Sequence, residues 1–310
     1  MRNLANRMQK IALLTFGLVA LTKVFEVETS QVNKLRKDSS RRMSSDDHSL
    51  ERPVMHTFYE KVSQGEDGLL DLWASEWSRA GFDTKVLTLA DAKANPHFEE
   101  MEKLVKPIFG ETYNGLCFYR WLAMVQDGGG WMSDYDTLPT NFPIEDGLNL
   151  PNGGHFTSFE AHVPSLMSGT EEEWMRVTNL LFEAIPKAQK DFGLASDMNA
   201  FLVLRNEGNH DIDFGVPYHN MRAGYHYKEP RNVDCTAMKN GRAIHFSHQK
   251  THEAFAHGLF PVDLPKDAKP SSDHRAEGSS IFMDDWRNQC QNEILEIKEK
   301  GNVFVAPERS

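Results

Sequence analysis

The sequence predicts an α/β fold in which helices cover a mostly parallel central sheet. Short runs rich in β-branched and aromatic residues alternate along the chain with stretches in which apolar residues recur at helical spacing. This alternation is typical of a sheet with helices packed on its faces. The chain has 310 residues, 40% of them hydrophobic, which suffices for one large α/β domain or two small ones.

The first predicted strand is Val54–Tyr59, a short β-branched and aromatic run. Apolar residues at helical spacing follow from Leu69 to Trp77, and Gly81 ends that helix. Thr84–Leu89 alternates as a second strand, and the pattern of a broken helix comes after it. These elements supply the first alternation of strand and helix on which the fold class rests.

The middle of the chain places two acids directly after a helix. Phe118–Val125 has the apolar spacing of an amphipathic helix, which the triplet Gly128–Gly130 ends, and "WMSDYD" follows as a short extended piece. In an extended segment, residues i and i+2 point the same way. Asp134 and Asp136 would then present two carboxylates on one side, about 7 Å apart along the backbone. Hard divalent cations bind such oxygen ligands.

The second half continues the alternation. "GHFTSFEA" alternates as a strand, and Thr170 with Glu173 forms a capping box at the start of a helix. Ser196 can cap a further helix, and Arg242–His248 reads as a late strand. Apolar residues from Trp286 to Ile297 predict a last helix.

The N-terminus predicts a separate segment. Residues 1–25 combine a basic start with an apolar run over Ile11–Thr22, the shape of a signal anchor or a signal peptide. An amphipathic N-terminus is the alternative, because the run falls short of the roughly 20 residues that span a bilayer. Residues 26–52 are rich in Ser, Asp, Lys and Arg and read as a flexible stem, which leaves residues 53–310 as one domain.

Charge and cysteine content narrow the classes of partner. The formal net charge of -11 gives no general attraction to phosphate backbones, so nucleic acid is not an expected partner. A polyphosphate would have to bind through a cation or through a local basic cluster. The three cysteines (Cys117, Cys235 and Cys290) allow one disulfide at most, and buried free thiols are the preferred interpretation.

The stretch "YRWLAMVQDGGGWMSDYDTLPTN", Tyr119–Asn141, combines an arginine in an aromatic helix, glycines, an aromatic residue and Asp-x-Asp. It resembles the glycosyltransferases of the GT-A fold whose sugar-binding region contains a DXD motif, the initiation-specific mannosyltransferase and capsular-polysaccharide type. The resemblance extends loosely from "PVMHTFYE" to "HFSHQKTHEAF". It implies a GT-A-like nucleotide-diphospho-sugar transferase sandwich over 53–310. The chain departs from the family pattern at Trp131 and Tyr135, which are bulkier than usual.

The resemblance also implies a binding site. The arginine and the acids would hold a sugar nucleotide with its Mn²⁺ or Mg²⁺ ion, and a histidine of the late strand would complete the metal shell. The first strand would lie beside the nucleotide base. The alternative for its histidine is a place in the hydrophobic core. The implied metal ligands are Asp134, Asp136 and either His245 or His248, between which the sequence does not choose. The implied sugar-nucleotide contacts are His56, Arg120, Gly129, Gly130, Asp134 and Lys250.

Two further carboxylates are candidates for a catalytic role. Asp197 opens a helix, where a negative charge also suits the helix dipole. By the resemblance, a carboxylate at this position can hydrogen-bond the donor sugar or the acceptor near the reacting carbon. Glu160 in "SFEAHVP" is a second candidate of the same kind.

The function predicted from the sequence is therefore a metal-dependent glycosyltransferase. It would move a hexose or an N-acetylhexosamine from a nucleoside-diphosphate sugar to a glycan or a lipid- or protein-linked acceptor, with retention. The N-terminal segment predicts a membrane-anchored enzyme with a lumenal domain in the ER or Golgi, or a secreted one if the segment is cleaved. Two alternatives stay open: an inactive sugar-nucleotide or glycan binding protein of the same fold, and a metal-dependent phosphoesterase.

Overall fold

The computed structural model describes residues 52–61, 66–110, 112–193, 196–208, 210–214, 221–223, 225–239, 241–260 and 272–291. All of them belong to the unit that spans Arg52–Ser310. The predicted signal segment, 1–25, and the predicted stem, 26–52, lie outside the described residues except for Arg52. Within the described part, no helix is both long enough and apolar enough to cross a membrane.

A six-stranded sheet in the order β2-β1-β3-β6-β5-β7 forms the centre of this unit. Its strands are β1 (Val54–Phe58), β2 (Asp83–Leu87), β3 (Gly129–Ser133), β5 (Thr157–Ser158), β6 (Leu166–Thr170) and β7 (Asp213–Phe214). Strand β1 runs parallel to β2 and β3, and β5 runs parallel to β7. Strand β6 is antiparallel to both of its neighbours. The predicted α/β class with a mostly parallel sheet is confirmed.

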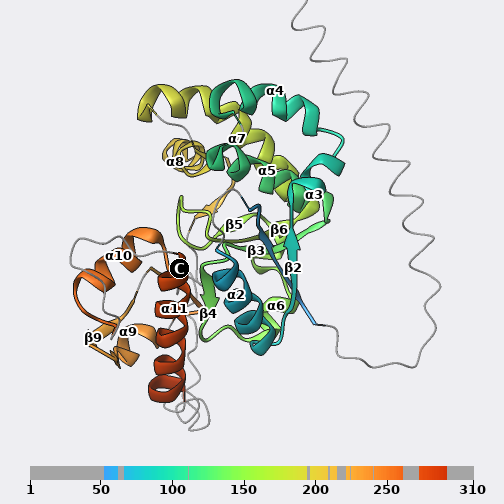
Figure 1. Cartoon of the computed structure of the whole chain (residues 1–310). Helices are drawn as coiled ribbons and strands as arrows, with labels where there is room; N and C mark the ends of the chain where they lie inside the picture. The colour runs from blue at the N-terminus through green and yellow to red at the C-terminus, as the bar shows by residue number, and fades with distance from the viewer. Residues whose placement is uncertain are drawn as a thin grey trace, which may run out of the picture. The chain divides into compact units, whose positions relative to one another are not determined.

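Helices cover both faces of the sheet, as Figure 1 shows. One face carries α3 (Leu89–Ala94), α4 (Phe98–Phe109), α5 (Tyr113–Gln126), α7 (Glu171–Phe192) and α8 (Asp197–Glu207). The other carries α2 (Asp67–Arg79), α6 (Ile144–Leu148) and α11 (Ser272–Trp286). The alternating side chains of β3 enter the two cores, because Trp131 packs in the core with α2 and α11 and Met132 packs in the core with α5 and α7.

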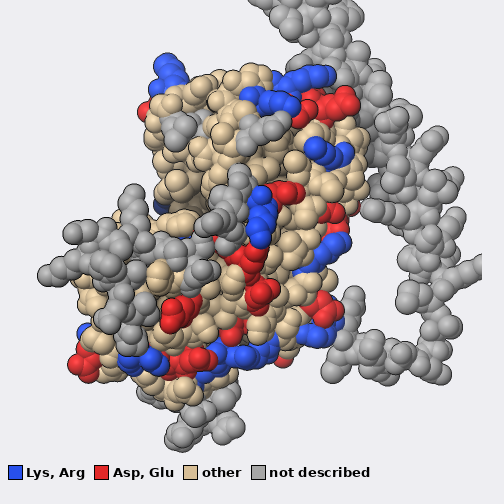
Figure 2. Space-filling view, in the orientation of Figure 1, with Lys and Arg blue, Asp and Glu red and all other residues tan. Residues whose placement is uncertain are grey.

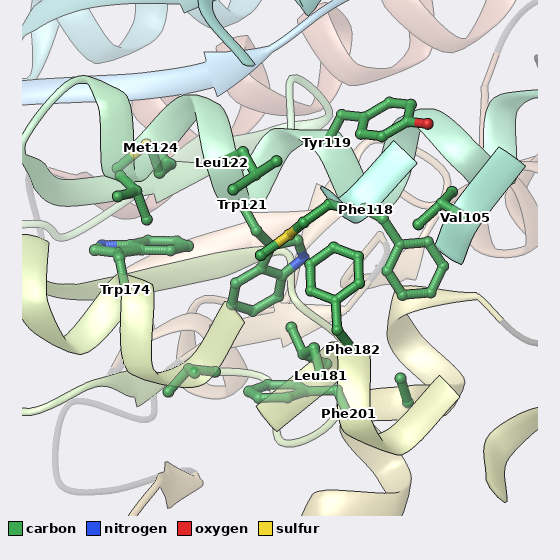
Figure 3. Packing of buried hydrophobic residues seen from close by; sticks show 14 of the residues in the cluster. Val105, Phe118, Tyr119, Trp121, Leu122, Met124, Trp174, Leu181, Phe182 and Phe201 are labelled. Atoms are coloured by element: carbon green, nitrogen blue, oxygen red, sulfur yellow. The ribbon is translucent and has the colours of Figure 1, made fainter. Parts of the chain in front are cut away.

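Aromatic side chains fill the core beside α5 and α7 (Figure 3). The ring of Trp121 lies 5.3 Å from that of Trp174 and 5.6 Å from that of Phe201, measured between centroids. Trp174 also donates its indole N–H to the carbonyl of Gly130 at 3.1 Å. The buried face of α7 packs against α5 and against β3, the strand that leads to the two acids.

A second, three-stranded sheet adjoins the turn after β3. It consists of β4 (Thr137–Pro139), β11 (Ala243–His245) and β8 (Met221–Ala223), with β11 antiparallel to β4 and parallel to β8. The hairpin of β9 (Tyr227–Glu229) and β10 (Asn232–Val233), the short η1 (Pro151–Gly154) and the helices α9 (Cys235–Met238) and α10 (His248–Ala256) complete the described elements, with η2 (Arg287–Gln291) after α11. The register pairs His245 with Thr137, which brings a late part of the chain beside the acids.

Two element predictions need correction, and a third falls partly outside the described residues. The predicted strand Arg242–His248 is only Ala243–His245, because Ser247 accepts a hydrogen bond from the Lys250 N–H and so caps α10. The capping box at Thr170 is half formed, since the Glu173 carboxylate binds Arg176 and the Phe156 N–H instead. The end of the last predicted helix, 292–297, lies outside the described residues.

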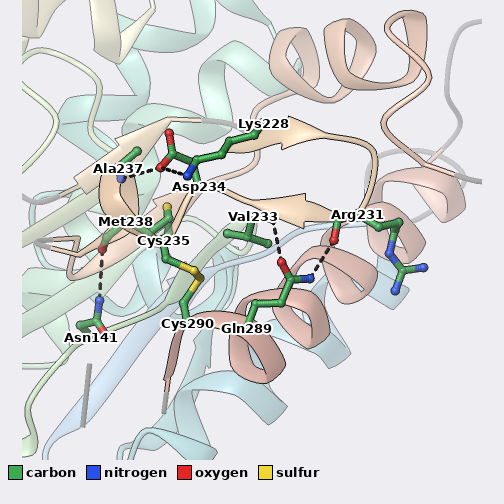
Figure 4. Close-up of a disulfide and its surroundings, with 10 residues drawn as sticks. All are labelled: Asn141, Lys228, Arg231, Val233, Asp234, Cys235, Ala237, Met238, Gln289 and Cys290. Atoms are coloured by element: carbon green, nitrogen blue, oxygen red, sulfur yellow. Dashed lines mark hydrogen bonds and ion pairs between the residues drawn. A yellow bond between two sulfur atoms is a disulfide. The ribbon is translucent and has the colours of Figure 1, made fainter. Parts of the chain in front are cut away.

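Two of the cysteines form a disulfide, contrary to the preferred interpretation of buried free thiols. Cys235 on α9 is bonded to Cys290 on η2, with 5.2 Å between their Cα atoms (Figure 4). Cys117 is a free thiol. Gln289 holds the same segment by accepting from the Val233 N–H and donating to the Arg231 carbonyl. The disulfide therefore links η2 to α9, and Gln289 links η2 to the β9–β10 hairpin.

On the face shown in Figure 2, basic and acidic side chains of the described residues alternate and do not gather by sign. Exposed ion pairs such as Lys61–Asp67 contribute little to stability because water screens them. Buried charges matter more for the fold, and several of them, among them Arg120, Asp136, Asp197 and Arg275, lie around the candidate site.

Reduction of the Cys235–Cys290 bond should destabilise the protein. The bond closes a loop with a sequence separation of 55 residues, for which a disulfide contributes about 2–4 kcal/mol. Urea unfolding with and without reductant measures this loss, and the Cys235→Ser/Cys290→Ser variant should unfold at the lower urea concentration in both buffers. Equal midpoints for the oxidised and reduced wild-type chain would contradict the assignment.

Candidate functional site

A cavity of about 610 Å³ opens where β1 and β3 end. Its walls come from the residues after these strands, from the first turns of α5 and α8, and from the residues between β11 and α10. In α/β sheets, ligands bind outside the carboxyl ends of parallel strands. The chain thus places its candidate acids at the edge of the sheet where a ligand is expected.

The two acids meet through a turn and not through an extended segment, which corrects the sequence prediction. Strand β3 ends at Ser133, and the Thr137 N–H donates to the Asp134 carbonyl at 2.9 Å. The Asp134 N–H donates to the carbonyl of Ser165 at 2.8 Å. As a result Asp134, Asp136 and His245 each offer one ligand atom, and these three atoms lie within 4.8 Å of one another.

The imidazole of His245 is oriented by a carboxylate. Its Nδ1 lies 2.8 Å from Glu160 Oε2, and its Nε2 lies 3.5 Å from Asp136 Oδ1. Ser165 donates its hydroxyl to the same Glu160 oxygen at 2.5 Å. A carboxylate behind a histidine fixes the ring so that its second nitrogen can bind a metal. Glu160 does not line the cavity, so the structure places this predicted catalytic candidate behind His245.

The other two predicted residues of this region do not join the cluster. His248 is the first residue of α10, its side chain is 76% exposed, and its Nε2 faces the guanidinium of Arg275 at 3.0 Å. Lys250 pairs with Glu253 at 2.7 Å on the surface of α10 and does not line the cavity. Between the two histidines that the sequence left open, the geometry favours His245.

Arg120 is held in place by two acids of the site. It is only 8% exposed, and its Nε donates to Asp197 Oδ2 at 2.8 Å while its Nη1 donates to Asp134 Oδ1 at 2.6 Å. Asp197 is 3% exposed and also accepts from the Trp121 indole N–H at 3.2 Å. Arg120 and Asp197 both line the cavity, and they are hydrogen-bonded to each other.

Burial and charge separate the pKa values of the two acids. Burial, helped by the neighbouring Asp136 carboxylate, outweighs Arg120 and raises the pKa of Asp134 to about 6. Burial acts in the same direction on Asp136, but His245, Arg275 and His248 outweigh it and lower its pKa to about 2. Burial would lower the pKa of His245, and the acids Asp136 and Glu160 raise it well above its usual value. The three groups form one coupled charge cluster.

His56, Gly129 and Gly130 lie at the opposite end of these strands. They line a separate hollow of about 580 Å³ together with Asp127 and Lys85. His56 contacts the Trp131 carbonyl and the Asp127 carboxylate, both at 2.8 Å. A Cβ at Gly129, whose φ is +77°, would lie 2.6 Å from the amide nitrogen of Glu171. This glycine permits close packing of β3 against α7, and the structure does not bring the three residues to the acid pair.

Sequence reasoning missed Arg275 and Glu66. Arg275 comes from α11 and is 1% exposed, and its Nη2 donates to Asp136 Oδ2 at 2.5 Å. Its Nη1 donates to Glu66 Oε1, and Tyr135 donates its hydroxyl to the other oxygen of Glu66. Neither residue belongs to a recognisable motif, and Arg275 lies 139 positions from Asp136 in the chain.

One family model matches the chain, over residues 45–190, and its description is a domain of unknown function (DUF8765). The matched range includes Arg120 and the acid pair and ends before Asp197 and His245. No curated protein and no solved structure matches the chain.

Mn²⁺ binding should distinguish the two histidines. We expect His245→Ala to weaken Mn²⁺ binding by at least 10-fold, because it removes a ligand atom, and His248→Ala to change it by less than about 3-fold. Isothermal titration calorimetry on the metal-free, full-length chain measures both affinities. Equal losses in the two variants would contradict the assignment of His245.

Loss of the Asp197 charge should destabilise the fold. The change Asp197→Asn leaves the buried Arg120 with one anionic partner, and breaking a buried pair typically costs about 3–5 kcal/mol. Urea unfolding monitored by circular dichroism measures the change. The matched control is Asp67→Asn, which breaks an exposed pair with Lys61 and should leave the unfolding midpoint almost unchanged. A stable Asp197→Asn variant would show that the pair does not hold the site together.

Proposed function

We propose that the chain is a metal-dependent glycosyltransferase of the GT-A fold. It transfers a hexose or an N-acetylhexosamine from a nucleoside-diphosphate sugar to a hydroxyl group of a glycan or of a lipid- or protein-linked acceptor. In this reaction the bond between the anomeric carbon and the diphosphate oxygen breaks, a bond to the acceptor oxygen forms, and the acceptor proton is released. The product retains the anomeric configuration, as in the enzymes that the sequence resembles.

The convergence of Asp134, Asp136 and His245 at one wall of the cavity carries this proposal. Two carboxylate oxygens and an imidazole nitrogen suit Mn²⁺ or Mg²⁺, and three protein ligands leave coordination positions for water and for substrate oxygens. When bound, such an ion neutralises the charge that develops on a departing diphosphate. The fold supports the proposal, since the acids follow a strand at the carboxyl edge of a mostly parallel sheet.

The side chains around the acid pair have different roles in the proposed reaction. Arg120 takes one oxygen of Asp134 and so leaves the second oxygen for the cation. Glu160 keeps the imidazole of His245 turned toward Asp136. Asp197 lines the same cavity from the first turn of α8 and holds Arg120 from behind. It is therefore a positioning residue for the acid pair, in addition to the sugar contact predicted for it.

The charges of the cavity make donor binding dependent on the cation. Among the described residues that line the cavity, Arg120 is the only Lys or Arg, and two carboxylates already bind it. A diphosphate would otherwise face Glu60, Glu66 and the acid pair, and like charges repel. The ion accordingly supplies the positive charge that the described side chains do not offer.

The disulfide supports the proposed location in the secretory pathway. Disulfides persist in oxidising compartments such as the ER lumen and are rare in the cytosol. The Cys235–Cys290 bond, together with the signal-like segment 1–25, favours a lumenal or secreted catalytic domain. An anchored enzyme facing the lumen of the ER or Golgi fits both features.

An inactive sugar-nucleotide binding protein of the same fold is the alternative, and one experiment separates the two. The full-length chain is incubated with a panel of UDP- and GDP-sugars and glycan acceptors, with Mn²⁺ or with EDTA, and NMR identifies the anomer of the product. We expect turnover with Mn²⁺ only. Because Asp136→Asn removes a charged ligand of the ion, it should lower kcat/KM at least 100-fold, which corresponds to about 2.7 kcal/mol in the barrier. Turnover that survives both EDTA and Asp136→Asn would refute the role of the metal, and tight Mn²⁺-dependent UDP binding without turnover would favour the binding protein.

A further inference from the structure

The guanidinium of Arg275 lies in a ring of metal-type donors next to the acid pair. Its Nη2 donates to Asp136 Oδ2 at 2.5 Å and to the carbonyl of Phe246 at 3.1 Å. Its Nη1 donates to Glu66 Oε1 and to Nε2 of His248, the latter at 3.0 Å. Two carboxylates, one imidazole nitrogen and one carbonyl oxygen therefore converge on a single positive group.

This donor set has the composition of a site for a divalent cation. Carboxylate and carbonyl oxygens with one imidazole suit ions such as Mn²⁺ and Mg²⁺. Asp136 is also shared, because its Oδ2 binds the guanidinium while its Oδ1 faces His245 in the candidate metal cluster. A carboxylate that bridges two neighbouring cations is the arrangement expected of two-metal enzymes, whose ions lie about 3.5–4 Å apart.

The geometry points to Arg275 as the permanent occupant of a second cation position. The centre then holds one divalent ion, bound by Asp134, Asp136 and His245, beside one fixed guanidinium. Arg275 is a positioning residue, since its side chain is 2% exposed and does not line the cavity. It acts through Asp136 by holding one oxygen and leaving the other for the ion.

The arrangement has a chemical consequence for the reaction. Two-metal hydrolases activate a water with one ion and stabilise the leaving oxygen with the other. A buried guanidinium has no place for a bound water and cannot perform the first task. The position of Arg275 thus disfavours the phosphoesterase among the alternatives that the sequence left open, and it favours transfer with a single ion.

The inference rests on the proposed metal position, because Asp136 serves both positions, but it can be tested by counting ions. Wild-type chain and Arg275→Ala are stripped of metal and titrated with Mn²⁺ by calorimetry, and electron paramagnetic resonance of the ion checks the count. We expect one Mn²⁺ per wild-type chain and two per Arg275→Ala chain, since in the variant Glu66, His248 and the second oxygen of Asp136 no longer bind the guanidinium. Millimolar guanidinium should compete with the added ion in the variant and have no effect on the wild type.

Matched variants make the count specific. Arg275→Lys keeps a positive charge and should bind one ion, and adding Glu66→Gln to Arg275→Ala should abolish the gain. Arg287 is the control, because it also joins two carboxylates, those of Glu76 and Asp284, but its described bonds include no imidazole and no carbonyl group. Arg287→Ala should therefore gain no ion. If Arg275→Ala does not fold without metal, Arg275→Met is titrated in its place.

The outcomes separate this inference from the proposed function. No added ion in Arg275→Ala or Arg275→Met, or an equal gain in Arg287→Ala, would overturn the inference. A wild-type chain that binds no Mn²⁺, beside a variant that gains one ion, would refute the proposed metal position and leave the second position supported.

Discussion

The structure depends on two buried guanidinium groups that hold the acids of one turn. Burying a carboxylate away from water is costly unless a positive group compensates it. Arg120 provides part of that compensation for Asp134, and Arg275 contributes to it for Asp136. The two arginines come from different helices, α5 and α11, on opposite faces of the sheet. The turn between β3 and β4 is therefore held by side chains from both cores.

The same constraint explains the choice between the histidines. Strand β11 pairs with β4 in a register that sets His245 beside Thr137, one residue after Asp136. Ser247 then caps α10, and the change from strand to helix carries His248 out of the strand. The lone pair of its Nε2 faces Arg275, which can only donate. His248 therefore lies against Arg275, and His245 is the histidine whose ligand atom lies with those of the acid pair.

The sequence predicted the elements whose signals are local. The start of α7 at Thr170 and the end of α5 before the glycine triplet depend on neighbours within a few residues, and both are found in the structure. The short strand β11 and the turn at Asp134 depend on pairing with distant segments, and their boundaries or geometry were wrong. Arg275 could not be predicted, because its partner Asp136 is 139 residues away and no pattern links them. Gly129 was interpreted as a ligand contact because sequence alone does not reveal that α7 packs against it.

The disulfide helps to hold Arg275 against Asp136, although the two residues lie far apart in the sequence. Arg275 lies near the start of α11, and the segment that follows α11 is bonded through Cys290 to Cys235 and through Gln289 to the β9–β10 hairpin. Arg231 of that hairpin also pairs with Asp285 near the end of α11. These contacts hold the C-terminal end of the helix, and a guanidinium that must meet two different carboxylates tolerates little displacement, since a hydrogen bond needs both a short distance and a favourable angle. The disulfide after the C-terminal end of α11 and the ion pairs of Arg275 near its start therefore both help to hold Asp136 in place.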